Sequence, residues 1–152
     1  MARASLNYME MALEQARLAA DRGEVPVGAV VVDGQSNEIL AAAGNRVLEL
    51  KDPTAHAEML AIRQATRKTG SERLVDVDIY VTLEPCPMCA TAMSFARIRR
   101  LYYGASDAKG GGVEHGPRIF SQETCHHAPE VIGGINETVA ASLLRDFFSE
   151  RR

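Results

Sequence analysis

Apolar residues near the start of the chain recur every three or four positions, with charged residues between them. The residues that follow this spacing are Leu6, Met9, Leu13, Ala16 and Ala20. The spacing is the period of an amphipathic helix, and Gly23 follows at a point where a helix commonly ends. The pattern therefore predicts a first helix that ends near Gly23.

The next apolar segments have the pattern of strands. Residues 27–32 form a continuous valine-rich run, which is typical of a buried strand. An Asp-Gly turn follows, and residues 38–43 form the return strand of a predicted hairpin. Residues 76–83 and 101–103 are predicted to form two further strands.

Three further helices are expected, each with a recognisable start or apolar face. Asp52-Pro53 supplies a cap and a first-turn proline for a helix that Gly70 ends. Pro87 begins another helix that runs to about Ala96. The apolar face of the last helix consists of Val139, Leu143, Leu144, Phe147 and Phe148. Strands that alternate with helices in this way indicate an α/β layered domain.

Length and composition indicate one domain. The chain has 152 residues, of which 46% are hydrophobic and 24% charged, as in an ordinary folded domain. No linker or repeat divides it, so we expect a single domain over residues 1–152. The net charge of −3 argues against broad phosphate binding but allows a local basic patch. Candidates for that patch are Arg97, Arg99, Lys109, Arg118 and the terminal arginines.

Cysteine usage and hydropathy together indicate the cytoplasm. The three cysteines are an odd number and two form a Cys-x-x-Cys pair, so a reduced intracellular protein is expected. The longest apolar run, residues 25–32, contains proline and glycine and is too short to cross a bilayer. The first residues lack the apolar core of a secretion signal. We expect a cytoplasmic protein with no membrane partner.

Two short motifs contain the side chains of one metal site. The first is His56-Ala57-Glu58, and the second is Pro85-Cys86-Pro87-Met88-Cys89. One imidazole and two thiolates suit a soft tetrahedral ion such as Zn²⁺, and three ligands leave one position for water. Glu58 is a carboxylate that can move protons at that water. The motifs therefore predict a hydrolytic site with one zinc ion per chain, bound by His56, Cys86 and Cys89.

The helix positions of these motifs support a shared site. Cys86 and Cys89 lie on one face of a predicted first turn, where unpaired N–H groups favour thiolates. His56 and Glu58 are two residues apart and would point to different sides of a regular helix. Both can face one metal if the metal lies beyond the helix end or if the helix starts at His56, and we favour His56 in the first turn because Pro53 is close.

Other interpretations stay open at this point. Cys86 and Cys89 could form a redox dithiol. Residues 125–127, Cys-His-His, could supply a fourth ligand and make the zinc structural, or could lie on a surface loop. The three glycines at 110–112 lack the Gly-Lys-Ser/Thr of a phosphate loop, so they indicate an adaptable nucleic-acid contact loop or an ordinary flexible loop.

The motifs and their surroundings resemble bacterial tRNA-specific adenosine deaminases of the cytidine and deoxycytidylate deaminase superfamily. The combination His-x-Glu and Pro-Cys-x-x-Cys marks zinc-dependent nucleobase deaminases. The other similar stretches are Gly44-Asn45-Arg46, residues 81–90, residues 104–109 and the end of the last predicted helix. The resemblance implies a three-layer, cytidine-deaminase-like α/β fold, with a mixed sheet of about five strands between helices, and a homodimer.

The resemblance also implies an activity. It is the hydrolytic deamination of the wobble adenosine in a tRNA anticodon loop to inosine, with a zinc-activated water and Glu58 as the proton shuttle. His56, Cys86 and Cys89 resemble the zinc ligands of the family. Alternatives are a free-base or nucleoside deaminase acting on guanine, cytosine or cytidine, and a non-catalytic, zinc-stabilised RNA-binding module.

Three further positions acquire roles only through this resemblance. Asn45 resembles the side chain that holds the flipped base, and Asp107 resembles a residue beside the ribose of a neighbouring nucleotide. Phe147 or Phe148 would close over the substrate loop. Plainer explanations are a left-handed turn at Asn45, a turn role for Asp107 and core packing for the phenylalanines.

Overall fold

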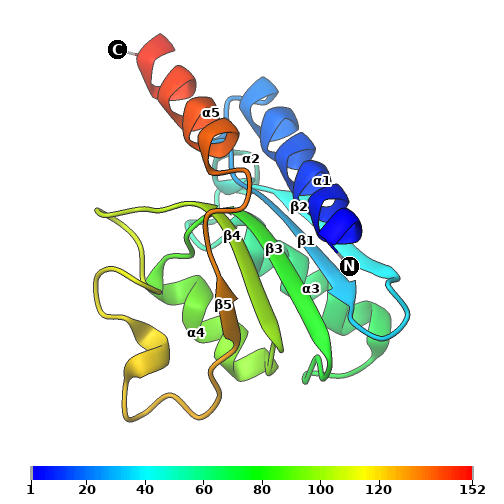
Figure 1. The fold of residues 1–152 in the computed structure, drawn as a ribbon. Helices are drawn as coiled ribbons and strands as arrows, with labels where there is room; N and C mark the ends of the chain where they lie inside the picture. Colours follow the sequence, from blue (N-terminus) through cyan, green and yellow to red (C-terminus); the bar gives the residue numbers. More distant parts are fainter. Residues whose placement is uncertain (1, 152) are drawn as a thin grey trace.

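The computed structural model describes residues 2–151, with side chains from Tyr8 onward, and is drawn in Figure 1. Its elements are α1 (Ala2–Asp21), β1 (Gly28–Asp33), β2 (Ile39–Gly44), α2 (Val47–Leu50), α3 (Ala57–Thr69), β3 (Val77–Leu83), α4 (Pro87–Ala96), β4 (Arg100–Ala105), the 3-10 turn η1 (Ile119–Ser121), β5 (Glu130–Ile132) and α5 (Glu137–Glu150). The side chain of Leu6, expected on the apolar face of the first helix, lies outside the described residues. In the described chain, no helix is long and apolar enough to cross a membrane.

The five strands form one mixed sheet in the order β2-β1-β3-β4-β5. β1 is antiparallel to both of its neighbours, β2 and β3. β3, β4 and β5 are mutually parallel along the sheet. The expected α/β fold with a mixed sheet of about five strands is confirmed.

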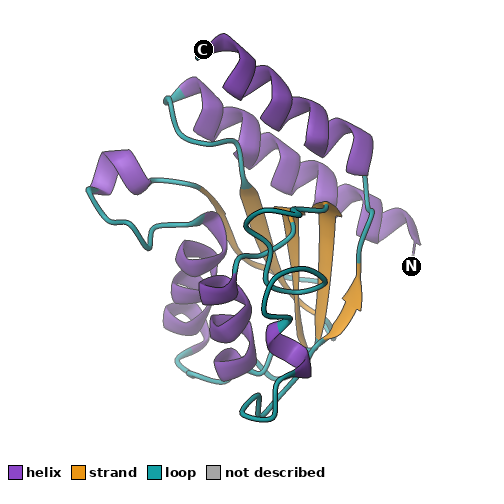
Figure 2. Cartoon of the chain, turned by 90° about the vertical axis from the view of Figure 1, so that its left-hand side faces the viewer, coloured by secondary structure: helices purple, strands orange, loops and turns teal. Residues whose placement is uncertain are grey.

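Helices cover both faces of the sheet and give three layers (Figures 1 and 2). Successive residues of β1 point to opposite faces. Val31 and its cross-strand partner Ile79 belong to the core under α3 and α4, whereas Val30 and its partner Tyr80 belong to the core under α1 and α5. On the α3 and α4 side the helices contribute many alanines, which allow a close approach to the sheet.

Strand direction determines where the site forms. Because β2 and β3 are both antiparallel to β1, they run the same way and end at the same edge of the sheet. α3 follows the end of β2, α4 follows β3, and both helices pack on one face of the sheet. The N-termini of α3 and α4 therefore lie close together.

The predicted start of the second long helix was wrong. α3 begins at Ala57 and not at Pro53, and His56 is its extended N-cap residue. Asp52 instead accepts hydrogen bonds from the Thr54 N–H at 2.8 Å and the Thr54 hydroxyl at 2.7 Å, which forms a turn before the helix. The predicted Pro87–Ala96 helix is confirmed as α4.

The apolar pattern missed the shortest elements and overestimated one helix face. β5 has three residues and α2 has four, too few to show a period. On α5, Phe147 is buried as expected, but Val139 is 42% exposed and Phe148 is 48% exposed. Ala140 and Phe147 form the buried stripe of α5, and Val139 and Phe148 lie at its two opposite margins.

Candidate metal centre and active site

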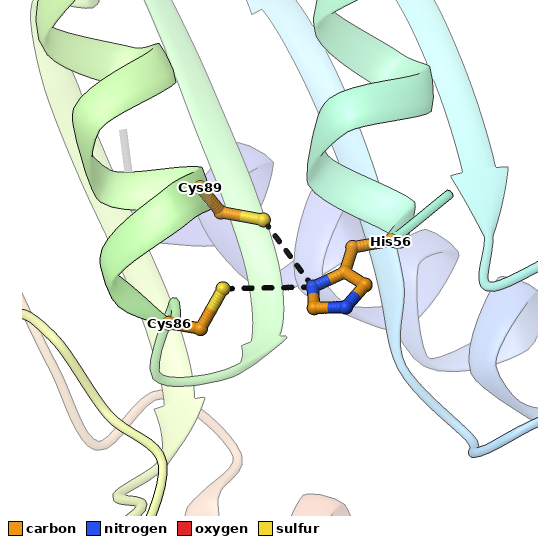
Figure 3. A group of neighbouring side chains, drawn as sticks. All are labelled: His56, Cys86 and Cys89. Carbon is orange, nitrogen blue, oxygen red and sulfur yellow. Dashed lines mark hydrogen bonds between the residues drawn. The ribbon is translucent and has the colours of Figure 1, made fainter. Parts of the chain in front are cut away.

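Three side chains converge where α3 and α4 begin (Figure 3). His56 and Cys86 are the N-cap residues of α3 and α4, both with extended backbone, and Cys89 lies in the first turn of α4. His56 Nδ1 lies 3.5 Å from the sulfur of Cys86 and 3.5 Å from the sulfur of Cys89. The ligand atoms of all three residues lie within 4.8 Å of one another.

This spacing fits a tetrahedral zinc ion. Zn–S bonds of about 2.3 Å and Zn–N bonds of about 2.0 Å, at the tetrahedral angle, place sulfur about 3.5 Å from nitrogen. The two observed N···S distances of 3.5 Å match that value. The separations of His56 from both cysteines are therefore those of a tetrahedral zinc site.

The Cys-His-His segment at 125–127 supplies no fourth ligand. Cys125 Sγ lies 3.5 Å from Ser94 Oγ, near the C-terminal end of α4, and His127 Nε2 lies 2.6 Å from the carbonyl oxygen of Ile98. Among the described residues, the group that could hold a metal ion consists of His56, Cys86 and Cys89 alone. A three-donor group leaves a coordination position for a non-protein ligand, as catalytic zinc sites do.

The charges at the site favour a cation. A hydrogen bond from the Cys89 thiol, helped by His56, lowers the pKa of Cys86 to about 4. The same bond, together with burial, raises the pKa of Cys89, and the bond to Cys86 raises the pKa of His56. Cys86 is thus a thiolate at the positive end of a helix.

Glu58 is a buried carboxylate beside this group. It is 4% exposed and lines the same pocket as His56 and Cys86. Burial, with a smaller contribution from the charge of Cys86, raises the pKa of Glu58 to about 7. A carboxyl group with such a pKa can both accept and deliver a proton near neutral pH. Because the helix begins only at Ala57, His56 and Glu58 can both face the pocket.

Asn45 connects β2 to the start of α3. Its Oδ1 accepts the Ala57 N–H at 2.7 Å, and its side chain is buried against the pocket. Its backbone is not left-handed, so the plainer explanation of a left-handed turn is wrong. With Oδ1 bonded to Ala57, the Nδ2 amide is the group that Asn45 offers to a ligand.

Asp107 and Phe147 also line the pocket. Asp107 Oδ1 accepts the N–H groups of Lys109 at 3.1 Å and Gly110 at 2.9 Å, so the residue does stabilise a turn. Phe147 is 7% exposed and lines the pocket, and the Arg151 guanidinium lies 3.5 Å from its ring centroid. Phe148 packs edge-on against Phe147 and does not line this pocket.

These residues surround one pocket of about 580 Å³, which we call the active-site pocket. The side chains singled out from the sequence that line it are Asn45, His56, Glu58, Cys86, Asp107 and Phe147. Cys89 is fully buried next to it. The volume is in the range of about 300–1,000 Å³ that is usual for ligand pockets.

Two buried glutamates of the pocket were missed. Glu24 accepts the N–H groups of Leu48 at 3.1 Å and Glu49 at 2.9 Å, and so fixes α2 beside the pocket. Glu84 bonds the loop that contains Asp107. For Glu84 the available signal was a carboxylate immediately after a buried strand, where an unpaired charge is costly.

Most of the basic residues expected to form a patch do not line the active-site pocket. Arg99 forms a two-pronged ion pair with Asp78, and Arg97 lies at the C-terminal end of α4, away from Cys86. Among the arginines of the described chain, Arg151 alone lines the active-site pocket.

Comparisons with known proteins agree with this geometry. The model of the MafB19-like deaminase family matches residues 4–152. The chain is 59% identical over 147 residues to the tRNA-specific adenosine deaminase of Agrobacterium fabrum, covering 96% of this chain and 95% of that protein. The chain belongs to the tRNA-specific adenosine deaminase family.

Solved structures extend the comparison. This deaminase is similar, with a TM-score of 0.88 and 58% identity, to a structure from a study of A-to-I editing by tRNA:A34 deaminases, covering 91% of this chain and 99% of that one. A guanine deaminase from Nitrosomonas europaea, at 24% identity, has the same fold, with a TM-score of 0.82 and coverage of 95% of this chain and 84% of that one. The family membership makes a redox dithiol role for Cys86 and Cys89 unnecessary.

Removing one cysteine tests the metal centre. We expect Cys86→Ala to lose stoichiometric zinc and deaminase activity together, because the two remaining protein ligands bind the ion too weakly to retain it. Cys125→Ala, which changes a cysteine outside the group, is expected to keep one zinc per chain. Metal analysis of the purified proteins measures both, and a Cys86→Ala protein with one tightly bound zinc would contradict the assignment.

Proposed function

We propose that this deaminase hydrolyses the wobble adenosine of a tRNA anticodon loop to inosine, releasing ammonia. The observation that carries the proposal is the buried carboxyl of Glu58 beside a three-donor metal group in an open-sided pocket. The substrate is supported by the relative from Agrobacterium fabrum, which is named a tRNA-specific adenosine deaminase. Guanine deamination has less support, because the guanine deaminase from Nitrosomonas europaea is 24% identical and the one from Bacillus subtilis, at 38% identity, covers only 66% of this chain.

We propose His56, Cys86 and Cys89 as ligands of one zinc ion per chain. When bound, the ion supplies Lewis-acid activation of a water molecule. Glu58 takes a proton from that water and delivers protons to the adenine ring nitrogen N1 and to the departing amine. Its pKa of about 7 suits this exchange because neither protonation state is strongly disfavoured at neutral pH.

We assign substrate-binding roles to three residues of the pocket. The Nδ2 amide of Asn45 donates to an acceptor on the base, since Oδ1 is bonded to Ala57. Phe147 supplies an aromatic surface that excludes water and contacts the substrate loop. Asp107 contacts the neighbouring ribose from a turn that Lys109 and Gly110 hold in shape. An anticodon loop presents unpaired bases, which lowers the cost of placing one in the pocket.

We also propose an RNA-binding, homodimeric and cytoplasmic protein. The homodimer follows from the family resemblance, and Phe95 on α4, which is 69% exposed, is a candidate contact residue for it. The thiol ligands must stay reduced to bind metal, which the cytoplasm ensures. The single domain expected over residues 1–152 is part of the same proposal.

Substitution of Glu58 tests the proton transfer. Glu58→Gln keeps the shape of the side chain but cannot accept or deliver a proton, so we expect kcat to fall by about 10²- to 10⁴-fold. Zinc content should remain one per chain. Glu72→Gln, at an exposed glutamate, is the matched control and should keep wild-type turnover. Wild-type turnover by Glu58→Gln would remove the assignment.

A substrate panel tests the proposed function itself. We expect the wild-type protein to convert an anticodon stem-loop RNA with a wobble adenosine and to ignore the same RNA with that adenosine moved by one position. Free guanine, cytosine and cytidine should not react. Inosine formation by mass spectrometry and ammonia release measure the outcome. Activity confined to a free base or nucleoside would disprove the tRNA assignment while leaving the hydrolytic chemistry intact.

A further inference from the structure

Glu84 is a buried carboxylate that takes no part in the proposed chemistry. It follows the last residue of β3 and directly precedes Pro85 and the ligand Cys86. Its side chain is 0% exposed. Among the lysines and arginines whose side chains the structure describes, none pairs with it, and the groups that compensate its charge are N–H donors of one loop.

That loop, residues 107–115, wraps around the carboxylate. Oε1 accepts the N–H of Asp107 at 3.0 Å and Nδ1–H of His115 at 2.7 Å. Oε2 accepts three backbone N–H groups, those of Val113 at 3.2 Å, Glu114 at 2.9 Å and His115 at 3.1 Å. Both ends of the loop are therefore bonded to one side chain.

The inside of the loop packs against the same carboxylate and against the metal-ligand turn. A Cβ at Gly111 would lie 2.5 Å from Glu84 Oε2, and a Cβ at Gly112 would lie 2.6 Å from the nitrogen of Pro87. Gly112 N–H donates to the carbonyl oxygen of Pro85 at 2.8 Å. The glycines expected to form a flexible or adaptable loop thus permit close packing on the residues around Cys86.

A hydrogen bond from β4 also holds the loop. The hydroxyl of Tyr103, on β4, donates to the carboxylate of Glu114. Glu84 itself accepts five hydrogen bonds from the loop, four of them from backbone N–H groups.

The loop forms one side of the active-site pocket through Asp107 and Gly110. We propose that Glu84 is a positioning residue: its carboxylate fixes loop 107–115 in the shape that binds the RNA around the target adenosine. This inference rests on the proposed function. It gives Glu84 a role in substrate binding, although Glu84 takes no part in the proposed proton transfers. Without the carboxylate, several loop N–H groups lose their acceptor and the loop loses its shape.

Steady-state kinetics on the zinc-loaded protein test the inference. Glu84→Gln offers one acceptor oxygen and turns an NH₂ group toward donors, so KM for the anticodon stem-loop should rise at least tenfold, which corresponds to about 1.4 kcal/mol. kcat at saturating RNA should change by less than about threefold, and zinc should stay at one per chain. A merely structural role would reduce the active fraction without raising KM.

Two further variants keep the test decisive. Gly111→Ala leaves Glu84 intact but pushes the loop off Oε2, and should raise KM in the same way even if Glu84→Gln does not fold. Asp78→Asn removes another buried carboxylate, one that pairs with Arg99 outside the active-site pocket, and should leave KM unchanged.

Unchanged KM in Glu84→Gln and Gly111→Ala would overturn the inference. So would loss of zinc from Glu84→Gln with a normal KM in the remaining active fraction, because that result would limit Glu84 to supporting the Cys86 turn. Wild-type turnover of the stem-loop is measured alongside, so that failure of the proposed function is seen separately from failure of the Glu84 role.

Discussion

The antiparallel pairing of β1 with both β2 and β3 is the constraint on which the site depends. It makes β2 and β3 run in the same direction, so the helices that follow them begin at one edge of the sheet. The alanines of α3 and α4 then allow both helices to lie close to the sheet. His56 and Cys86 are the N-cap residues of these two helices. As a result His56 Nδ1 lies 3.5 Å from Cys86 Sγ, although the residues are 30 positions apart in the chain. Each helix N-terminus adds positive potential that favours thiolate and carboxylate groups.

Three buried glutamates near this edge of the sheet have different hydrogen-bond partners and therefore different proposed roles. Burial, with a smaller contribution from the charge of Cys86, outweighs the hydrogen bond and the His56 charge that favour the carboxylate, so the pKa of Glu58 rises to about 7 and it can exchange protons. Glu84 is equally buried, but backbone N–H groups surround it and its pKa falls, so it stays charged and organises a loop. Glu24, also at the pocket, likewise accepts backbone N–H groups, those of Leu48 and Glu49 in α2. The environment of each side chain, and not its residue type, separates proton transfer from positioning.

The sequence pattern predicted those elements whose start and end depend on residues close together in the chain. Pro87 at a helix start and the alternating strands gave α4, β1 and β3 close to their observed bounds, and the motif spacing brought together the three metal-ligating side chains. The start of α3 was misjudged because the acceptor for the Ala57 N–H is Asn45, twelve residues earlier, whereas Asp52 only resembled a cap. Glu84 was missed for the same reason, since its partners lie 23 to 31 residues later in a loop without periodicity. Contacts of this kind become visible only when the chain is folded.

X-ray absorption at the zinc edge of the purified, active protein tests the central claim most directly. The account predicts two sulfur ligands at about 2.3 Å and two nitrogen or oxygen ligands at about 2.0 Å, one of which exchanges with solvent or an added inhibitor. A first shell made entirely of protein donors, or a third sulfur, would contradict it, because the position on which Glu58 acts would then be filled.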